Sequence, residues 1–146
     1  VVNIPVDMSL DTMLTKLKLS PPDTAEMKQP VLQGGPVHGD RGFVLHSFRP
    51  GFNSTLQVSD EMMVTTSKDI LETLGTDEAP DHWLVALGYA GWSAGQLEQE
   101  LVDGAWLVIP PNPKLVFDTP IHLRWQQAAA SIGVNPLHLS SQVGHS

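Results

Sequence analysis

Three groups of residues in the sequence have types and spacings that could support chemistry. The first is GWSAG at residues 91–95, which matches the G-x-S-x-G nucleophile elbow of serine hydrolases. A hydrolase would need a histidine beside Ser93 and a carboxylate behind that histidine. The available partners stand in no recognisable arrangement: Asp103, Asp118, His122, His138 and His145. Because Gln96 follows Ser93 by three residues, a capping box at a helix start is the preferred interpretation of this serine.

The second group consists of glycine-rich turns that could bind an anion through backbone N–H groups. Gly88-Tyr89-Ala90-Gly91 precedes a helix start, where the helix dipole favours negative charge. The dinucleotide fingerprint G-x-G-x-x-G is absent, and Glu98 and Glu100 would repel a phosphate that they faced. Glycines that permit a tight turn, with a positive φ in the Gly34-Gly35-Pro36 turn, are therefore the preferred interpretation of both turns.

The third group combines Asp40, Arg41 and His46 with the hydroxyl groups of residues 65–67. Arg41 could hold a carboxylate or phosphate in bidentate fashion, beside an acid-base pair. The competing interpretation is local, because polar residues at turns and caps usually bond to nearby backbone. It makes Asp40 a turn residue, Arg41 a partner in an ion pair, and Ser67 a helix cap.

The stretch from Trp83 to Ile109 contains the elements that must position these groups. Residues 83–87 form an apolar run ended by Gly88, which predicts an interior strand. Residues 93–102 carry apolar side chains at helical spacing and predict an amphipathic helix. A second apolar run at 105–109 completes a predicted β-α-β unit whose strands are neighbours or near-neighbours.

The remaining periodicities predict further helices and strands around this unit. A helix should bury Leu10, Met13, Leu14 and Leu17, with Ser9 or Asp7 as its cap. Strands are expected at 31–33 and 41–46, joined as a hairpin, and at 54–58 and 62–66. A short helix should follow Ser67. A longer helix should follow Thr119, after a stiff proline connector at 110–113. The tryptophans at 83, 106 and 125 are expected in the core, whereas Trp92 lies in a turn.

Composition limits the class of protein. The 146 residues predict one α/β domain, 1–146, with a mixed sheet and helices packed on its faces. The absence of cysteine excludes disulfides and thiolate metal sites and fits the cytoplasm. Eight basic against sixteen acidic residues give a formal charge of -8 without a basic stripe, so direct nucleic-acid binding is not expected. No run is long enough to span a membrane, and Val1 opens in mid-strand, so an N-terminal part is predicted to be missing.

Several long stretches together resemble the bacterial family named after AlgH and YqgE. They are GGPVHGDRGFVLH (34–46), VTTSKDILETLGT (64–76), ALGYAGWSAGQLEQEL (86–101), AWL (105–107), FDTPIHLRW (117–125) and the closing GHS. The resemblance implies a compact α/β domain with a mixed sheet and an upstream strand and helix. It also carries the family's label of transcriptional regulator, but no catalytic residue, because the family has no agreed active site.

We therefore expect a regulatory or interaction protein that binds a protein partner or small ligand at the GGP, TTS and GYAGW turns. The candidate surface comprises Gly34, Gly35, Asp40, Arg41, His46, Thr65, Thr66, Ser67, Tyr89, Gly91, Trp92 and Gln96. No catalytic residue, cofactor or metal ligand is predicted, and the expected state is a monomer or weak homo-oligomer. A small hydrolase using Ser93 is the alternative, and direct action on DNA ranks third.

Overall fold

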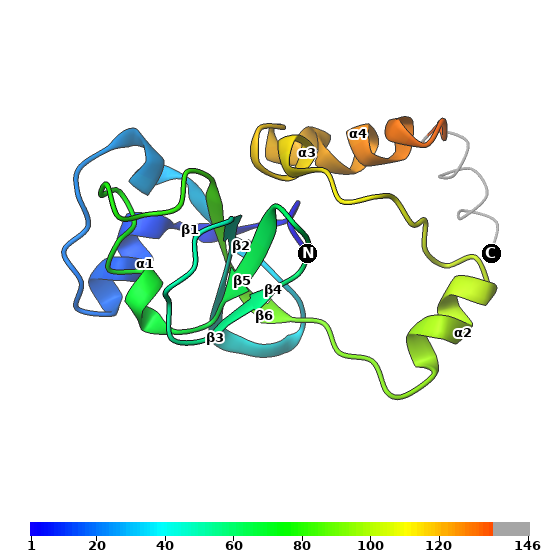
Figure 1. Cartoon of the computed structure of the whole chain (residues 1–146), viewed down its shortest axis with the longest axis horizontal. Helices are drawn as coiled ribbons and strands as arrows, with labels where there is room; N and C mark the ends of the chain where they lie inside the picture. Colours follow the sequence, from blue (N-terminus) through cyan, green and yellow to red (C-terminus); the bar gives the residue numbers. More distant parts are fainter. Residues whose placement is uncertain (136–146) are drawn as a thin grey trace. The chain divides into compact units, whose positions relative to one another are not determined.

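The computed structural model describes residues 1–135, and the chain divides into two compact units, Val1–Ala90 and Gly91–Ser146. The first unit contains a mixed six-stranded sheet with the strand order β1-β2-β6-β3-β5-β4 (Figure 1). Its strands are β1 (Pro5–Ser9), β2 (Pro30–Gln33), β3 (Val37–Ser47), β4 (Thr55–Gln57), β5 (Met62–Thr65) and β6 (Trp83–Tyr89). The predicted α/β class with a mixed sheet is confirmed.

Strand β6 lies inside the sheet, between a parallel and an antiparallel neighbour. Leu32 of β2 is in register with Ala86 in the parallel pair, and Val44 of β3 is in register with Val85 in the antiparallel pair. The apolar run is buried on both faces, as expected for a strand covered on both sides. The interior position predicted for residues 83–87 is confirmed. The predicted hairpin of β2 and β3 is wrong, because β6 lies between them.

Helix α1 (Leu10–Lys16) packs its apolar stripe into the core of the first unit. Leu10, Met13 and Leu14 are buried, and they contact a core to which the sheet contributes Val44 and Val85. Two 3-10 helices, η1 (Ala25–Lys28) and η2 (Lys68–Ile70), add Met27 and Ile70 to this core. The helices predicted before residue 18 and after Ser67 are thus present, the second as a 3-10 turn.

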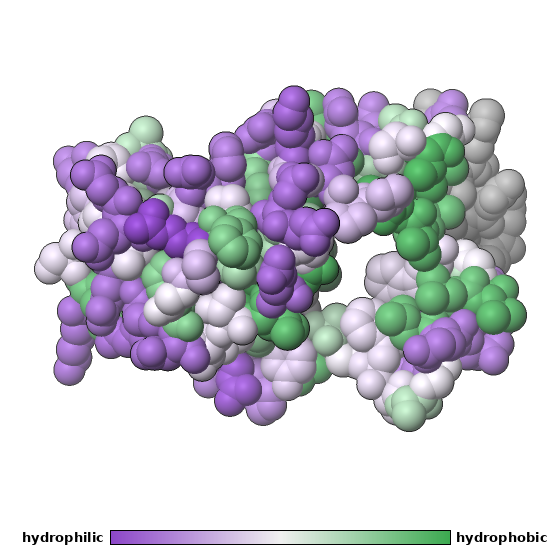
Figure 2. Space-filling model, in the orientation of Figure 1, coloured by the Kyte–Doolittle hydropathy of each residue, from purple (hydrophilic) through white to green (hydrophobic). Residues whose placement is uncertain are grey.

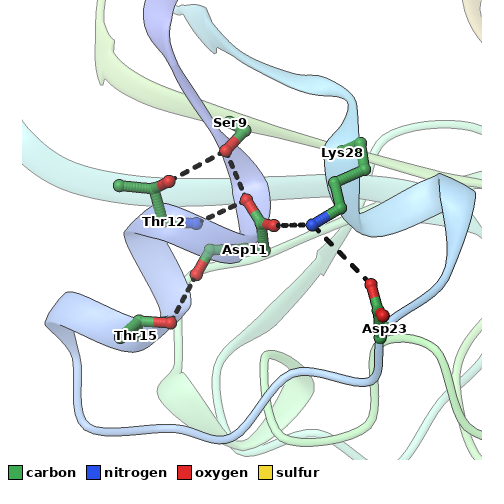
Figure 3. A network of polar contacts seen from close by, with 6 residues as sticks. All are labelled: Ser9, Asp11, Thr12, Thr15, Asp23 and Lys28. Carbon is green, nitrogen blue, oxygen red and sulfur yellow. Dashed lines mark hydrogen bonds and ion pairs between the residues drawn. The ribbon is translucent and has the colours of Figure 1, made fainter.

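A polar network ties the start of α1 to η1 (Figure 3). Asp11 accepts hydrogen bonds from Lys28 Nζ and from the Thr12 backbone N–H, each at 2.7 Å, and from the Ser9 hydroxyl. These bonds, that of Lys28 first, lower the pKa of Asp11 to about 2. Ser9 occupies the N-cap position but does not cap through its side chain, and Asp7 lies within β1. The predicted cap is therefore replaced by an ion pair between two elements.

Two glycine segments meet backbone to backbone where β2 and β6 end. The Gly34 N–H donates to the Leu87 carbonyl at 2.7 Å. A Cβ atom on Gly34 would overlap the Gly88 carbonyl oxygen, and one on Gly35 would overlap the Tyr89 backbone. Gly34 and Gly35 are therefore needed for close approach. The positive φ predicted for the GGP turn is wrong, since the positive φ of 76° belongs to Gly88.

The second unit is helical over its described residues, with no strand between 91 and 135. It contains α2 (Gln96–Val102), α3 (Pro113–Phe117), η3 (Ile121–Leu123) and α4 (Arg124–Ser131). The predicted helix after Thr119 is confirmed as η3 and α4, and Gly133 follows with a φ of 74°. The stiff connector at 110–113 instead leads into α3, because Asn112 caps Leu115 N–H and Pro113 suits the first helical position.

The predicted strand at 105–109 is wrong, and with it the β-α-β unit. Trp106 and Val108 are 49% and 72% exposed, and the segment pairs with no strand in the described chain. An apolar run of five residues has the composition of a buried strand, but composition alone does not supply a pairing partner. Trp125 is also 49% exposed, so the core position predicted for the tryptophans at 106 and 125 is wrong. Figure 2 shows hydrophobic surface, in green, over the second unit.

Helix lengths in the described residues are short. None of the helices between residues 1 and 135 has the length and hydrophobicity needed to cross a membrane. The closing GHS motif and the histidines at 138 and 145 lie outside the described residues.

We predict that Gly34→Ala and Gly35→Ala destabilise the first unit by ~1–3 kcal/mol or more, because the added methyl group has no room. Urea denaturation followed by circular dichroism measures the change in free energy of unfolding. Gly39→Ala is the matched control, since a Cβ atom there meets nothing within 4 Å. Equal stabilities of all three variants would contradict the close-packing explanation.

Candidate functional site

The first unit contains a cavity of about 350 Å³ on the side of the sheet that carries α1. Its wall is built by β1, α1, β3, β6 and the turn that joins β5 to η2. The lining residues are Met8, Met13, Lys16, Leu17, Asp40, Gly42, Phe43, Val44, Thr65, Thr66, Ser67, Lys68, Leu71, Val85 and Leu87. A cavity of this size with a few polar groups among apolar side chains is typical of small-molecule sites.

The cavity has an apolar floor and a polar rim. Val44 and Val85, side by side in the sheet register, belong to the buried core beneath it. Lys16, Lys68 and Asp40 are exposed residues that supply charge at its edge. The arrangement suits a ligand with an apolar body and at least one polar group.

The TTS turn, residues 65–67, contributes unequally to this rim. The Ser67 hydroxyl bonds to Asp69 and also accepts the Ser54 N–H at 3.1 Å, so it is used within the turn. Burial would raise the pKa of Asp69, but hydrogen bonds from Ser67 and from backbone N–H groups outweigh it and lower the pKa. Thr66 is exposed at the rim, and it is the residue of this turn best placed to meet a ligand.

His46 and Thr65 are fully buried, each with an exposed fraction of 0%, so neither lies on an open surface as predicted, although Thr65 belongs to the cavity lining. His46 Nδ1 lies 2.8 Å from the Ser47 carbonyl, which only accepts, so this nitrogen carries the proton. Nε2 therefore accepts from the Thr65 hydroxyl at 2.7 Å, and Thr65 in turn accepts from Thr55 at 2.8 Å. Burial lowers the pKa of His46, and the bond to Ser47 opposes this more weakly.

The other predicted residues of the first unit have separate positions. Gly34 and Gly35 are buried against the end of β6, and Tyr89 packs its ring on Phe43 at a centroid distance of 5.5 Å. Arg41 is exposed and lies outside the cavity lining. It forms no ion pair within residues 1–135, so the ion pair suggested by the local interpretation is wrong.

Gly91, Trp92 and Gln96 belong to the second unit. Trp92 and Trp106 both donate their indole N–H to Glu100, at 3.0 and 2.7 Å, and their rings meet edge to face. The bond from Trp106, then that from Trp92, lowers the pKa of Glu100. Trp92 therefore has a defined local role: together with Trp106 it hydrogen-bonds the carboxylate of Glu100.

The structure gives Ser93 a local role as well. The Ser93 backbone N–H and hydroxyl both bond to Gln96 Oε1 at 3.0 Å, which preserves one half of the predicted capping box. Helix α2 begins later than predicted, and Gly95, with a φ of 81°, occupies the N-cap position. Within the described residues the Ser93 hydroxyl is bonded to an amide rather than to a histidine, so the geometry gives it no base.

Sequence reasoning missed the two lysines of the cavity rim. Lys16 and Lys68 are separated by more than fifty positions, and each looks like an ordinary surface residue at a helix end. The sequence contained one signal for the cavity at this end of α1. The apolar stripe of the helix continues to Leu17, which is 40% exposed in the structure. Across residues 1–135, His, Asp and Glu form no cluster able to hold a metal ion.

The fold and cavity define an α/β protein with a mixed sheet and a ligand-sized hollow on one face. Comparison with known proteins adds the family, since residues 1–137 match the model described as AlgH-like, DUF179. UPF0301 proteins of Aliivibrio fischeri strain MJ11 and Vibrio cholerae are 51% and 47% identical to the chain. Each match covers 99% of this chain and 79% of the relative. The chain belongs to the AlgH-like family.

Solved structures agree with this assignment. The solution structure of the AlgH protein from Pseudomonas aeruginosa matches with a TM-score of 0.76 and 42% identity, over 99% of this chain and 77% of that one. A crystal structure of protein DIP2367 from Corynebacterium diphtheriae matches with a TM-score of 0.54 and 17% identity, over 77% and 59% of the two chains. The second likeness concerns the fold alone. The predicted resemblance to the AlgH and YqgE family is confirmed.

We predict that the first unit loses stability as the pH falls below about 6.5, the ordinary pKa of histidine. His46 stays neutral in the fold because its pKa is lowered there, whereas the unfolded chain takes up a proton in this window. Free energies of unfolding measured between pH 7 and pH 5 should therefore decrease. The loss ends once the pH is below the folded pKa, and carboxylates such as Asp11 act only at lower pH.

His46→Gln keeps a neutral polar group and should flatten this pH dependence. His122→Gln, at an exposed position in the second unit, is the control and should leave the slope unchanged. A wild-type stability that does not vary between pH 7 and pH 5 would rule out the buried neutral imidazole.

Proposed function

We propose that the protein is a regulatory or interaction protein that binds a small ligand in the cavity beside α1. The observation that carries the proposal is the cavity of about 350 Å³ with an apolar floor and a charged rim. Two residues of the expected surface, Asp40 and Thr66, are exposed at this rim. The proposed binding face is thus centred on the TTS turn, whereas Gly34 and Gly35 lie outside the cavity lining.

The geometry favours binding over catalysis. A nucleophile needs a base within hydrogen-bond reach and access to the substrate. The Thr65 hydroxyl lies within hydrogen-bond reach of a base, His46. However, Thr65 is fully buried, and its hydroxyl is also hydrogen-bonded to Thr55. Ser93 is exposed but bonds to Gln96. Among the contacts of residues 1–135, neither hydroxyl combines both requirements.

Charge favours a ligand or protein partner over DNA as the target. The formal charge of -8 opposes the approach to phosphates that DNA binding requires. Helix α2 contains Glu98 and Glu100 and no basic residue, and α4 contains only Arg124. The guanidinium of Arg124 is buried and donates to the Thr119 carbonyl at 3.0 Å, so α4 has no basic recognition face. A regulatory effect therefore passes through the ligand-bound protein rather than through direct contact with a duplex.

The test is a titration of the full-length protein with 1-anilinonaphthalene-8-sulfonate, an aromatic probe with an apolar body. Two-dimensional amide NMR should show shifts grouped at α1, β3 and the turn of residues 65–67. Thr66→Trp places a large ring at the rim. It should lower the affinity for the probe, obtained from the shifts along the titration, by about tenfold or more.

Thr12→Trp is the matched control, because Thr12 is exposed on α1 and lies outside the cavity lining. It should bind the probe as the wild type does. Shifts distributed over the whole surface, or equal binding by both variants, would contradict a site in the cavity.

A further inference from the structure

The charges at the cavity rim are unusual for this chain. The protein has eight basic and sixteen acidic residues, yet the cavity lining contains Lys16 and Lys68 and one carboxylate, Asp40. Two positive charges and one negative charge give a local excess of +1 in a chain of formal charge -8. An anion is therefore attracted to this rim although the protein as a whole repels it.

The two lysines come from neighbouring segments of the cavity wall. Lys68 Nζ is 3.5 Å from the carbonyl oxygen of Leu17, which is the residue next to Lys16. The start of η2 therefore contacts the C-terminal end of α1, the segment that also carries Lys16. Asp40 comes from β3, a different element of the wall. The positive charges of the rim thus come from the adjoining ends of α1 and η2, and its negative charge comes from β3.

Neither ammonium group is neutralised by a carboxylate. Within residues 1–135 the ion pairs are those of Lys28 with Asp11 and with Asp23, so Lys16 and Lys68 remain available for a ligand. Both residues are exposed and can move toward a bound anion at little cost. An ammonium group that meets an anion in a partly apolar setting forms a stronger bond than it does in open water.

The floor beneath them is suited to a hydrocarbon or aromatic body. Leu71 and Leu87 are half-buried, so each leaves apolar surface that a ligand can cover. A cavity of about 350 Å³ has room for on the order of ten water molecules, which corresponds to a small ligand.

We propose that the cavity selects small amphiphilic anions, with the carboxylate or phosphate group at Lys16 and Lys68 and the apolar body against the sheet. This inference rests on the proposed function, and it names the chemical class of the ligand. A neutral or cationic molecule with the same body binds more weakly, because it leaves the lysines without a partner or repels them.

The experiment compares four linear probes with eight carbon atoms each: octanoate, octyl phosphate, octanol and octylammonium. Binding to the full-length protein is followed by amide NMR shifts at the cavity and by calorimetry. Octanoate or octyl phosphate should bind about tenfold more tightly than octanol, and octylammonium should bind most weakly. The comparison of the two anions shows which head group is preferred.

The double variant Lys16→Gln, Lys68→Gln should remove the preference for the anions and leave octanol binding unchanged. The control is Lys18→Gln, Lys114→Gln, which changes the net charge by the same amount at positions outside the cavity lining. It should keep the preference. Both doubles replace exposed side chains, and circular dichroism verifies that they fold.

The outcomes separate the two proposals. If octanol binds in the cavity as tightly as octanoate, or octylammonium binds best, the anion inference is overturned and the proposed binding function stands. If both double variants lose the preference equally, long-range charge rather than the two rim lysines is responsible, and the inference also fails. If none of the four probes shifts the cavity residues, the proposed function itself is contradicted.

Discussion

The first unit depends on a contact between two backbones, in which Gly34 and Gly35 lie against Gly88 and Tyr89. This contact continues the parallel pairing of β2 with β6 beyond the last paired residues. Since β6 also pairs with β3, its position fixes both halves of the sheet. Strand β6 contributes to the face of the sheet that carries α1 and thus to the cavity floor. The position of this floor therefore depends on a close backbone contact that only glycine permits.

Much of this unit could be predicted from the sequence because its signals are local. The apolar run at 83–87 and the 3.6-residue spacing of Leu10, Met13 and Leu14 each specify one element by themselves. Strand pairing is different, since nothing in the spacing of β2 and β3 indicates that β6 lies between them. The same limit applies to residues 105–109, whose composition suits a buried strand although they are exposed.

The candidate site was only partly predictable for a related reason. The sequence indicated polar turns, and Thr66 and Asp40 do lie at the cavity rim. It could not indicate that Lys16 joins them, because the cavity is formed by the approach of α1 to β3 and to the turn after β5. Residue type also does not tell a histidine at a binding surface from one in the core. His46 is buried, and both of its ring nitrogens have hydrogen-bond partners.

The hydroxyl chain from His46 through Thr65 to Thr55 crosses three adjacent strands, β3, β5 and β4. Each member needs its neighbour as donor or acceptor, so replacing one by an apolar residue leaves a buried polar atom without a partner. A change at one position therefore favours a matching change at the next. Natural variation at these three positions should be coupled, with the trio inherited as one polar unit or lost together in favour of apolar packing.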